Sequence, residues 1–221
     1  ILTNNDKTQP VKQLVNSIQS RGHKASVLLL DKVKVLVSNN SKGYDGLYYS
    51  DKSKTLKLSK ANIGEVVLPR MGANLHYGAK VIHHLTENMG IYCPISSTGL
   101  LNASDKLKSL QLASQAGIKT PKTIMGNELQ DVSYIIKQLG LPVIIKFVYG
   151  SLGVGVSIVE TRIGLKTTLQ SFSKLKKPFI IQEFINAGNR DIRAVVLGNS
   201  IISAYQRIGR SGDFRANLSQ N

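Results

Sequence analysis

A lysine and a group of glycines near the middle of the chain have the types and spacing to bind phosphate. Lys146 interrupts the apolar, β-branched run Val143–Val148, and Gly150, Gly153 and Gly155 follow it. Glycines at this density let backbone N–H groups converge on an anion, and a neighbouring lysine adds positive charge. The motif taken alone also fits a flexible hairpin with a solvent-facing lysine.

Two familiar nucleotide motifs are excluded. The glycines lead into the apolar run Val156–Val159 rather than into a helix, which excludes the dinucleotide-binding fingerprint, and no Gly-Lys-Ser/Thr follows, which excludes a P-loop. The pattern predicts a strand, a glycine-rich turn and a strand, forming a β-hairpin that covers a nucleotide. Lys146 is the strongest candidate because a lysine inside an apolar strand needs a partner.

The residues before this hairpin predict an α/β unit with a largely parallel sheet, because strand and helix patterns alternate. The first strand-to-helix connection, Asn4–Lys7, lacks the glycines of a dinucleotide site, so we expect this unit to shape a substrate surface. His83 and His84 are neighbours on one predicted helix, and adjacent helical side chains diverge too far to share a metal. We expect strands at 1–3, 27–30 and 66–68, helices at 11–20 and 77–89, and a hairpin from 43–50 and 55–58.

A helix is expected at Asp105–Ala116, with Ser104 as its N-cap and Gly117 as its stop. Lys106 and Lys108 fall in its first turn, where the helix macrodipole disfavours cations. Either both side chains extend into water, or the unfavourable placement serves a site.

The remaining pattern predicts two further helices, one strong strand and a second hairpin around the turn Gly198-Asn199. The strand, FIIQEFI, is interrupted by Gln182 and Glu183. We expect helices at 129–139 and 164–172, the strand at 179–185, and the hairpin strands at 192–197 and 201–205.

Composition limits the class of protein. The chain of 221 residues has 29 Lys+Arg against 13 Asp+Glu, a net charge of +16, which indicates either an acidic partner or a compositional bias towards lysine. The single cysteine, Cys93, excludes an internal disulfide and fits a reducing compartment. No apolar run approaches the roughly 20 residues that span a bilayer. Because the chain starts at Ile1 and stops at Asn221 without a terminating pattern, we interpret it as a fragment.

Six segments, in order, resemble the ATP-grasp family and, within it, the RimK-type carboxylate–amine ligases. They are VLPRMG at 67–72, SDKLKSLQLASQAGI at 104–118, PVIIKFVYGSLGVGVSIVE at 142–160, IIQEFI at 180–185, DIRAVVLGN at 191–199 and GDFRANL at 212–218. The resemblance implies an α/β protein with α+β lobes: a pre-ATP-grasp domain at 1–103, and an ATP-grasp domain at 104–221. The second domain would have a small lobe carrying the glycine-rich lid and a C-terminal antiparallel lobe that is incomplete.

The resemblance also implies roles for individual residues around ATP. Lys146 and Lys106 would contact the phosphates, and the lid over them would include Gly150, Ser151, Gly153 and Gly155. The adenine edge would be formed by Gln182, Glu183, Phe184 and Ile185.

Further residues would bind the ribose and the substrates. Asp191 resembles the ribose-binding acid, and Arg193 and Arg207 would orient phosphate or carboxylate. Arg215 and Asn217 would form the catalytic, substrate-facing end of the DFRxN motif, together with Arg207. Other interpretations stay open: Glu183 could be a solvated strand residue, Asp191 could cap a turn, and the arginines could be surface charges.

The resemblance implies a reaction in which ATP converts a carboxylate to an acyl phosphate and an amine then displaces the phosphate. The cofactors would be ATP and Mg²⁺ or Mn²⁺. In the family the metal-binding acids follow on later strands, so we assign no metal ligand among these residues and expect the fragment by itself to be inactive. Tyr149 stands where close relatives are expected to have an acidic residue.

We therefore expect an ATP-dependent ligase that adds glutamate to the C-terminus of a ribosomal protein or an acidic peptide. A glutathione-synthetase-like or amino-group-carrier ligase would fit the same motifs, and a basic RNA- or ribosome-binding module is the alternative from another class. The expected location is the cytoplasm, without a membrane partner, and relatives suggest a homo-oligomer.

Overall fold

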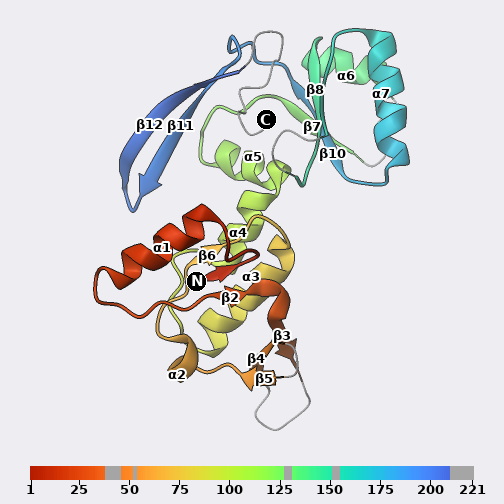
Figure 1. Ribbon diagram of the computed structural model, residues 1–221. Helices are drawn as coiled ribbons and strands as arrows, with labels where there is room; N and C mark the ends of the chain where they lie inside the picture. The colour runs from red at the N-terminus through yellow and green to blue at the C-terminus, as the bar shows by residue number, and fades with distance from the viewer. Residues whose placement is uncertain (38–45, 52–53, 127–130, 151–154, 210–221) are drawn as a thin grey trace. The chain divides into compact units, whose positions relative to one another are not determined.

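The computed structural model describes residues 1–37, 46–51, 54–126, 131–150 and 155–209. Contacts divide the chain into two units, Ile1–Ser104 and Asp105–Asn221, whose elements are labelled in Figure 1. Each unit has its own apolar cluster.

The first unit contains the expected parallel sheet. Strand β1 (Leu2–Thr3) lies between β2 (Leu28–Leu29) and β6 (Pro69–Arg70), and it is parallel to both. The strand expected at 66–68 is found two to three residues later, at Pro69–Arg70. Within the expected range, the Leu68 carbonyl accepts from the Leu2 N–H at 3.0 Å, and Val66 forms an isolated parallel bridge with Tyr92. Proline is tolerated in β6 because an edge strand does not need every N–H donor.

A second, antiparallel sheet in this unit consists of β3 (Val33–Leu36), β4 (Gly46–Asp51) and β5 (Lys54–Lys57). The described part of the predicted hairpin is therefore confirmed. The first unit also contains the helices α1 (Gln9–Gln19), η1 (Leu30–Lys32), α2 (Lys60–Ile63), α3 (Leu75–His83), η2 (His84–Asn88) and α4 (Ser97–Ser104).

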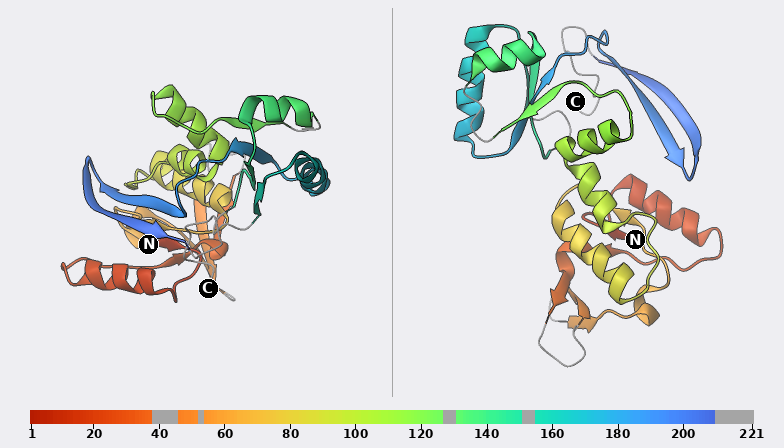
Figure 2. Two further views of the ribbon diagram at one scale, coloured as in Figure 1. Left: turned by 90° about the horizontal axis from the view of Figure 1, so that it is seen from above. Right: turned by 180° about the vertical axis from the view of Figure 1, so that it is seen from behind.

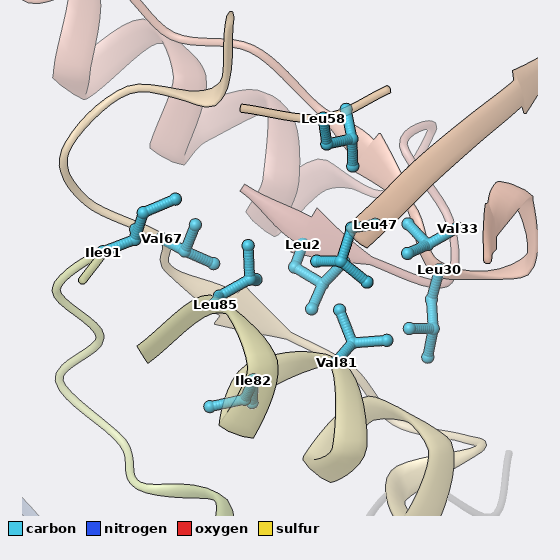
Figure 3. Close-up of a cluster of buried hydrophobic side chains, with 10 residues drawn as sticks. All are labelled: Leu2, Leu30, Val33, Leu47, Leu58, Val67, Val81, Ile82, Leu85 and Ile91. Carbon is cyan, nitrogen blue, oxygen red and sulfur yellow. The ribbon is translucent and has the colours of Figure 1, made fainter. Parts of the chain in front are cut away.

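The core of the first unit joins both sheets to α3 and η2 (Figure 3). The predicted helix at 77–89 is confirmed, although its last part, η2, has π-helical hydrogen bonds. Val81, Ile82 and Leu85 are at most 1% exposed, on one face of this helix. Burial of each such aliphatic side chain contributes about 1.5–3 kcal/mol, so this stripe fixes the helix on the strands.

The second unit contains a four-stranded antiparallel sheet with the order β7-β10-β8-β9. Its elements are α5 (Lys106–Gln115), β7 (Thr123–Met125), α6 (Val132–Leu139), β8 (Val143–Phe147), β9 (Val156–Val159), α7 (Arg162–Lys174) and β10 (Phe179–Glu183). A separate two-stranded sheet follows, formed by β11 (Arg190–Leu197) and β12 (Ser200–Ile208). Both hairpins expected in this unit are confirmed. The strand β7 of this unit was not predicted, nor were β3, α2 and α4 of the first unit.

Alternation along the strands gives the four-stranded sheet one apolar face. Val143, Ile145 and Ile181 lie on this face and pack against α6 and α7, and the two helices lie side by side in both views of Figure 2. Lys146 directly follows Ile145, and Gln182 directly follows Ile181. Because successive side chains of a strand point to opposite faces, both lie on the other face of the sheet. The sheet thus separates a packed core from a face that carries polar groups.

None of the helices in the described part of the chain is long and apolar enough to cross a membrane.

Candidate ATP-binding site

Strand register places three polar side chains on one face of the four-stranded sheet. Gln182 on β10 is directly opposite Thr123 on β7. On the other side of β10, Lys146 of β8 pairs with Ile180, which is two residues from Gln182. Because side chains two residues apart share a face, Lys146 and Gln182 are diagonal neighbours. Three strands thus bring together a cation, an amide and a hydroxyl.

These side chains form a continuous chain of hydrogen bonds. The ammonium of Lys146 donates to Oε1 of Gln182 at 2.7 Å, and Nε2 of Gln182 donates to Oγ1 of Thr123 at 2.8 Å. The Thr123 hydroxyl in turn donates to the Pro121 carbonyl at 2.9 Å. Gln182 is only 7% exposed, so the amide satisfies its hydrogen bonds within the protein rather than with water. The partner that a lysine in an apolar strand requires is Gln182.

Lys106 brings a second ammonium to this region from the first turn of α5. Its Nζ donates to the carbonyls of Val148 at 3.2 Å and Gly150 at 2.8 Å, and its backbone N–H also donates to Val148, at 3.3 Å. Lys106 is half-buried and Lys108 is exposed. The interpretation that both lysines extend into water is therefore wrong for Lys106 and consistent with the structure for Lys108.

The cap of α5 differs from the prediction. Asp105, and not Ser104, is the N-cap: its Oδ1 accepts from the Lys108 N–H at 2.9 Å. Ser104 is the last residue of α4, and its hydroxyl donates to the Leu101 carbonyl at 2.8 Å. Two helices therefore meet at this point, and the serine ends the first one.

Asp105 also contacts the residue that precedes the glycine turn. The Tyr149 hydroxyl donates to Asp105 Oδ2 at 3.1 Å, and this hydrogen bond raises the pKa of Tyr149. The resemblance to the family predicts an acid at position 149. In the structure, an acid from another element lies next to that position.

The electrostatics of the two lysines set this region apart. Burial lowers the pKa of the Lys146 ammonium, and the charge of Lys106 lowers it further. Burial also lowers the pKa of Lys106, and the carboxylate of Asp105 opposes that shift. Among the described residues, both ammonium groups donate to neutral oxygens and neither forms an ion pair with a carboxylate. Two partly desolvated cations without such a counterion favour an anion.

The glycines at both ends of the predicted lid have backbones that favour glycine. Gly150 has φ 134° and Gly155 has φ 70°, values that other residues rarely adopt. A Cβ on Gly155 would also lie 2.4 Å from the Phe147 ring. Glycine is therefore required at position 155 on two separate grounds. Ser151 and Gly153 lie outside the described residues, as do Arg215 and Asn217.

The predicted adenine edge, 182–185, has its backbone fixed by neighbouring segments. The Glu183 N–H donates to the Lys122 carbonyl at 3.0 Å, and the Glu183 carboxylate accepts from the Lys122 N–H at 2.8 Å. The Phe184 N–H donates to Pro142 at 3.3 Å. Glu183 therefore holds the start of β7, which contradicts the interpretation of a simply solvated strand residue. Ile185 is 60% exposed.

The remaining predicted residues lie on the β11–β12 hairpin. Asp191 and Arg207 are opposite each other and form a bidentate ion pair, with Arg207 Nε donating at 2.7 Å. The hydrogen bond from Arg207 lowers the pKa of Asp191, and the charges of Arg207 and Arg193 contribute in the same direction. Asp191 lies within a strand, so the alternative that it caps a turn is wrong. Arg193 is exposed and pairs with Tyr205.

Metal and thiol chemistry have little support in the described part of the chain. There, no group of three or more His, Cys, Asp and Glu side chains is arranged to hold a metal. His83 is exposed and His84 is buried, as expected for neighbours on a helix. Cys93 is half-buried, and burial raises the pKa of its thiol, which disfavours a nucleophilic role.

Thr123 and the capping role of Asp105 were not predicted from the sequence. Thr123 lies in the three-residue strand β7, too short for an alternating pattern. The signal available for Asp105 was its own residue type, because aspartate is as good an N-cap as serine.

Comparisons with known proteins agree on one family. The RimK-like ATP-grasp domain matches residues 103–221 and the RimK PreATP-grasp domain matches residues 1–100. Proteins named "Probable alpha-L-glutamate ligase" from Cellvibrio japonicus and Pseudoalteromonas translucida are 32% and 34% identical to this chain over 221 residues. Each alignment covers 99% of this chain and 70% of the relative.

Solved structures show the same fold. A RimK domain ATP-grasp protein from Sphaerobacter thermophilus has a TM-score of 0.66 at 19% identity, over 93% of this chain and 72% of that one. The ATP-grasp ligase PsnB, in complex with a variant of its minimal precursor, Mg and ADP, has a TM-score of 0.65 at 16% identity, over 96% of this chain and 72% of that one. The predicted ATP-grasp fold is confirmed.

Proposed function

We infer the function of this protein from its family: the chain belongs to the RimK-like ATP-grasp family of ATP-dependent ligases. The predictions of an ATP-grasp ligase and of carbon–nitrogen bond formation are confirmed at that level. We propose that the protein adds glutamate to the carboxylate end of an acceptor. The names of the curated relatives support glutamate as the amine substrate.

The observation that carries this proposal is the pair of ammonium groups at Lys106 and Lys146. Lysines held by neutral oxygens keep their full charge for a ligand, whereas an ion pair with a carboxylate would neutralise it. A nucleoside triphosphate supplies several negative oxygens at the spacing of neighbouring phosphates. We assign the ATP phosphates to this pair and to the backbone N–H groups of the adjoining glycine turn.

The proposed chemistry proceeds in two steps. An oxygen of the acceptor carboxylate attacks the γ-phosphorus, and ADP leaves, which gives an acyl phosphate. The amine nitrogen of glutamate then attacks the acyl carbon, forms the amide bond, loses a proton and displaces inorganic phosphate. Phosphoryl transfer depends mainly on positioning and on neutralising charge, and Lys106 and Lys146 supply both without a covalent protein intermediate.

The family uses a divalent metal together with ATP, and we propose Mg²⁺ for this protein. The metal would neutralise phosphate charge during transfer. We assign no described residue to the metal, because none of the described acids is grouped to hold one. Arg207, Arg215 and Asn217 stay as proposed substrate-facing residues, and Asp191 as the proposed ribose ligand.

For the acceptor we propose an acidic peptide or a protein C-terminus. The net charge of +16 favours such a partner through long-range attraction. PsnB, one of the structural neighbours, is described in complex with a precursor peptide, which supports a peptide acceptor over a small molecule. A ribosomal protein, a cytoplasmic location and a homo-oligomer stay predictions.

The direct test follows ADP release by the full-length protein with Mg²⁺-ATP, glutamate and a short acidic peptide, each omitted in turn. We expect ADP release only with all components present, and a peptide heavier by one glutamate residue in the mass spectrum. Release without glutamate dependence would contradict the proposed amine substrate.

A matched pair of variants connects this activity to the site. Lys146→Met removes the ammonium and should weaken ADP binding about 100-fold, whereas Lys108→Met removes an exposed lysine nearby and should leave both binding and turnover unchanged. If Lys146→Met still bound ADP as the wild type does, the assignment of the phosphates would be wrong. Salt-sensitive RNA binding without any nucleotide binding would instead favour a basic RNA-binding module.

A further inference from the structure

We propose that Thr123 is a positioning residue for the nucleotide site, which acts through the amide of Gln182 to hold the Lys146 ammonium where a phosphate can reach it. This inference rests on the proposed function, since it concerns the same ATP site. The backbone of Gln182 belongs to the predicted adenine edge. The proposal gives its buried side chain a different role, that of holding Lys146. Thr123 also lies on β7, a strand that was not predicted from the sequence.

The direction of each hydrogen bond in this series is determined by the groups at its two ends, the Lys146 ammonium and the Pro121 carbonyl. An ammonium only donates, so the oxygen of the Gln182 amide must face Lys146 and the NH₂ group must face Thr123. The Thr123 hydroxyl donates its one proton to Pro121, at 2.9 Å, which leaves its oxygen free to accept from that NH₂ group at 2.8 Å. With the amide reversed, two donors would face each other at Lys146.

Because these side chains are buried or half-buried, the arrangement depends on each hydrogen-bond partner within the protein. Gln182 is 7% exposed and Thr123 is half-buried, so water is a poor substitute for a lost partner. Without the Thr123 hydroxyl, the NH₂ group of the amide has no fixed acceptor at that end. The amide then loses the constraint that keeps its oxygen on Lys146, and the ammonium becomes free to leave its position.

The groups that hold Lys146 in this hydrogen-bond chain are uncharged, and this is significant for the ligand. Gln182 holds Lys146 through a carbonyl dipole at 2.7 Å, which orients the ammonium without cancelling its charge. Among the described residues, the neighbouring side chains on the paired strands are Ile180 and Val156, and the charge of Lys106 acts on Lys146. A carboxylate in place of this amide would fix the lysine equally well and compete with the phosphate for it.

The test compares Thr123→Val with Thr123→Ser in the full-length protein, with ADP as the probe and calorimetry as the measurement. Valine keeps the shape and removes the hydroxyl, and should weaken ADP affinity about 3- to 10-fold. Serine restores the hydroxyl and should return the affinity to within about 2-fold of the wild type. Thr167→Val removes an exposed hydroxyl that donates to Ile163 in α7, and should leave ADP affinity unchanged.

A double-substitution cycle shows whether Thr123 acts through Gln182. In a Gln182→Met background the amide is absent, so Thr123→Val should cause no further loss of ADP affinity. Independent, additive losses would overturn the proposal, as would wild-type affinity in Thr123→Val or a serine variant as weak as valine. If Thr123→Val does not fold, Thr123→Ser and Gln182→Met still test the proposal. It requires wild-type ADP affinity in Thr123→Ser and weakened ADP affinity in Gln182→Met.

Failure of this inference can be told apart from failure of the proposed function. If the wild-type protein binds ADP and Lys146→Met binds it much more weakly, but Thr123→Val binds it as the wild type does, only the positioning role is overturned. Wild-type protein that binds no ADP would overturn both. In turnover assays the positioning role predicts a higher KM for ATP in Thr123→Val, restored in Thr123→Ser.

Discussion

The four-stranded sheet and the β11–β12 hairpin hold their cationic side chains in opposite ways. In the sheet, Lys146 donates to the neutral amide of Gln182, at 2.7 Å. In the hairpin, Arg207 forms a bidentate ion pair with the carboxylate of Asp191. Both cations were predicted to face phosphate or substrate, but of the two only Lys146 keeps its charge uncompensated. A predicted ligand-binding cation should therefore be judged by its partner as well as by its residue type.

The two regions also differ in how their apolar side chains are covered. Ile145 and Ile181 in the sheet are fully buried under α6 and α7. In the hairpin, Ile192 is 78% exposed and Ile201 is 68% exposed. Register in the sheet is fixed by burial of one face, whereas in the hairpin it depends on the turn and on cross-strand pairs such as Asp191–Arg207.

Loss of the Lys146 ammonium should have the largest effect. We expect Lys146→Met to weaken ADP binding about 100-fold, because a charge-assisted contact to phosphate contributes up to about 3 kcal/mol. Arg207→Met should weaken ADP binding far less, since its charge is already paired. Calorimetric titration of both variants checks the difference, and equal losses would contradict it.

Replacing glycine by alanine should reduce stability more in the turn between β8 and β9 than in the turn between β11 and β12. Gly155→Ala forces a Cβ against Phe147 at 2.4 Å and keeps φ near 70°, and should lower the free energy of unfolding by about 2–4 kcal/mol. At Gly198, with φ 59°, no described atom lies within 4 Å of the added Cβ, so Gly198→Ala should cost only about 1 kcal/mol. Urea denaturation measures both, and a larger cost at Gly198 would contradict the described packing.

The pH dependence of ADP binding should report the lowered pKa of Lys146. Binding requires the ammonium, which is lost as pH rises through its pKa. Because burial and Lys106 place that pKa below the ordinary value of a lysine, ADP affinity should begin to fall at a lower pH than an exposed lysine would give. Calorimetry from pH 7 upward tests this prediction, and constant affinity up to the pH at which free lysine titrates would refute it.

The smallest effect is expected for the ion pair of the hairpin. A double-mutant cycle with Asp191→Asn and Arg207→Met should give only a weak coupling in the free energy of unfolding, and this coupling should fall as salt is added. The hydrogen bond and charge of Arg207 lower the pKa of Asp191, so this contribution is present above the ordinary pKa of aspartate and is lost as pH falls through the lowered value. A strong coupling that does not fall with salt would indicate a buried pair instead.

Much of the fold was determined by local sequence. Apolar periodicity located α1, α3 and α6, and the turn Gly198-Asn199 located the β11–β12 hairpin, because these signals arise within a few consecutive residues. The lysine at position 146 was also identified by sequence alone, since a charge in an apolar strand has no favourable environment without a partner. Six motifs in a fixed order along the chain were sufficient to indicate the family.

Only the tertiary structure showed which groups hold Lys146. Gln182 is 36 residues and Thr123 is 23 residues away in sequence from the lysine that their hydrogen bonds serve. Their meeting depends on the order β7-β10-β8 and on the register of each pair, and a shift of one residue would turn each side chain to the other face. The choice of Asp105 over Ser104 as cap likewise depended on where α4 ends. Local sequence determines which elements form, and long-range pairing, which no local pattern encodes, determines which side chains meet.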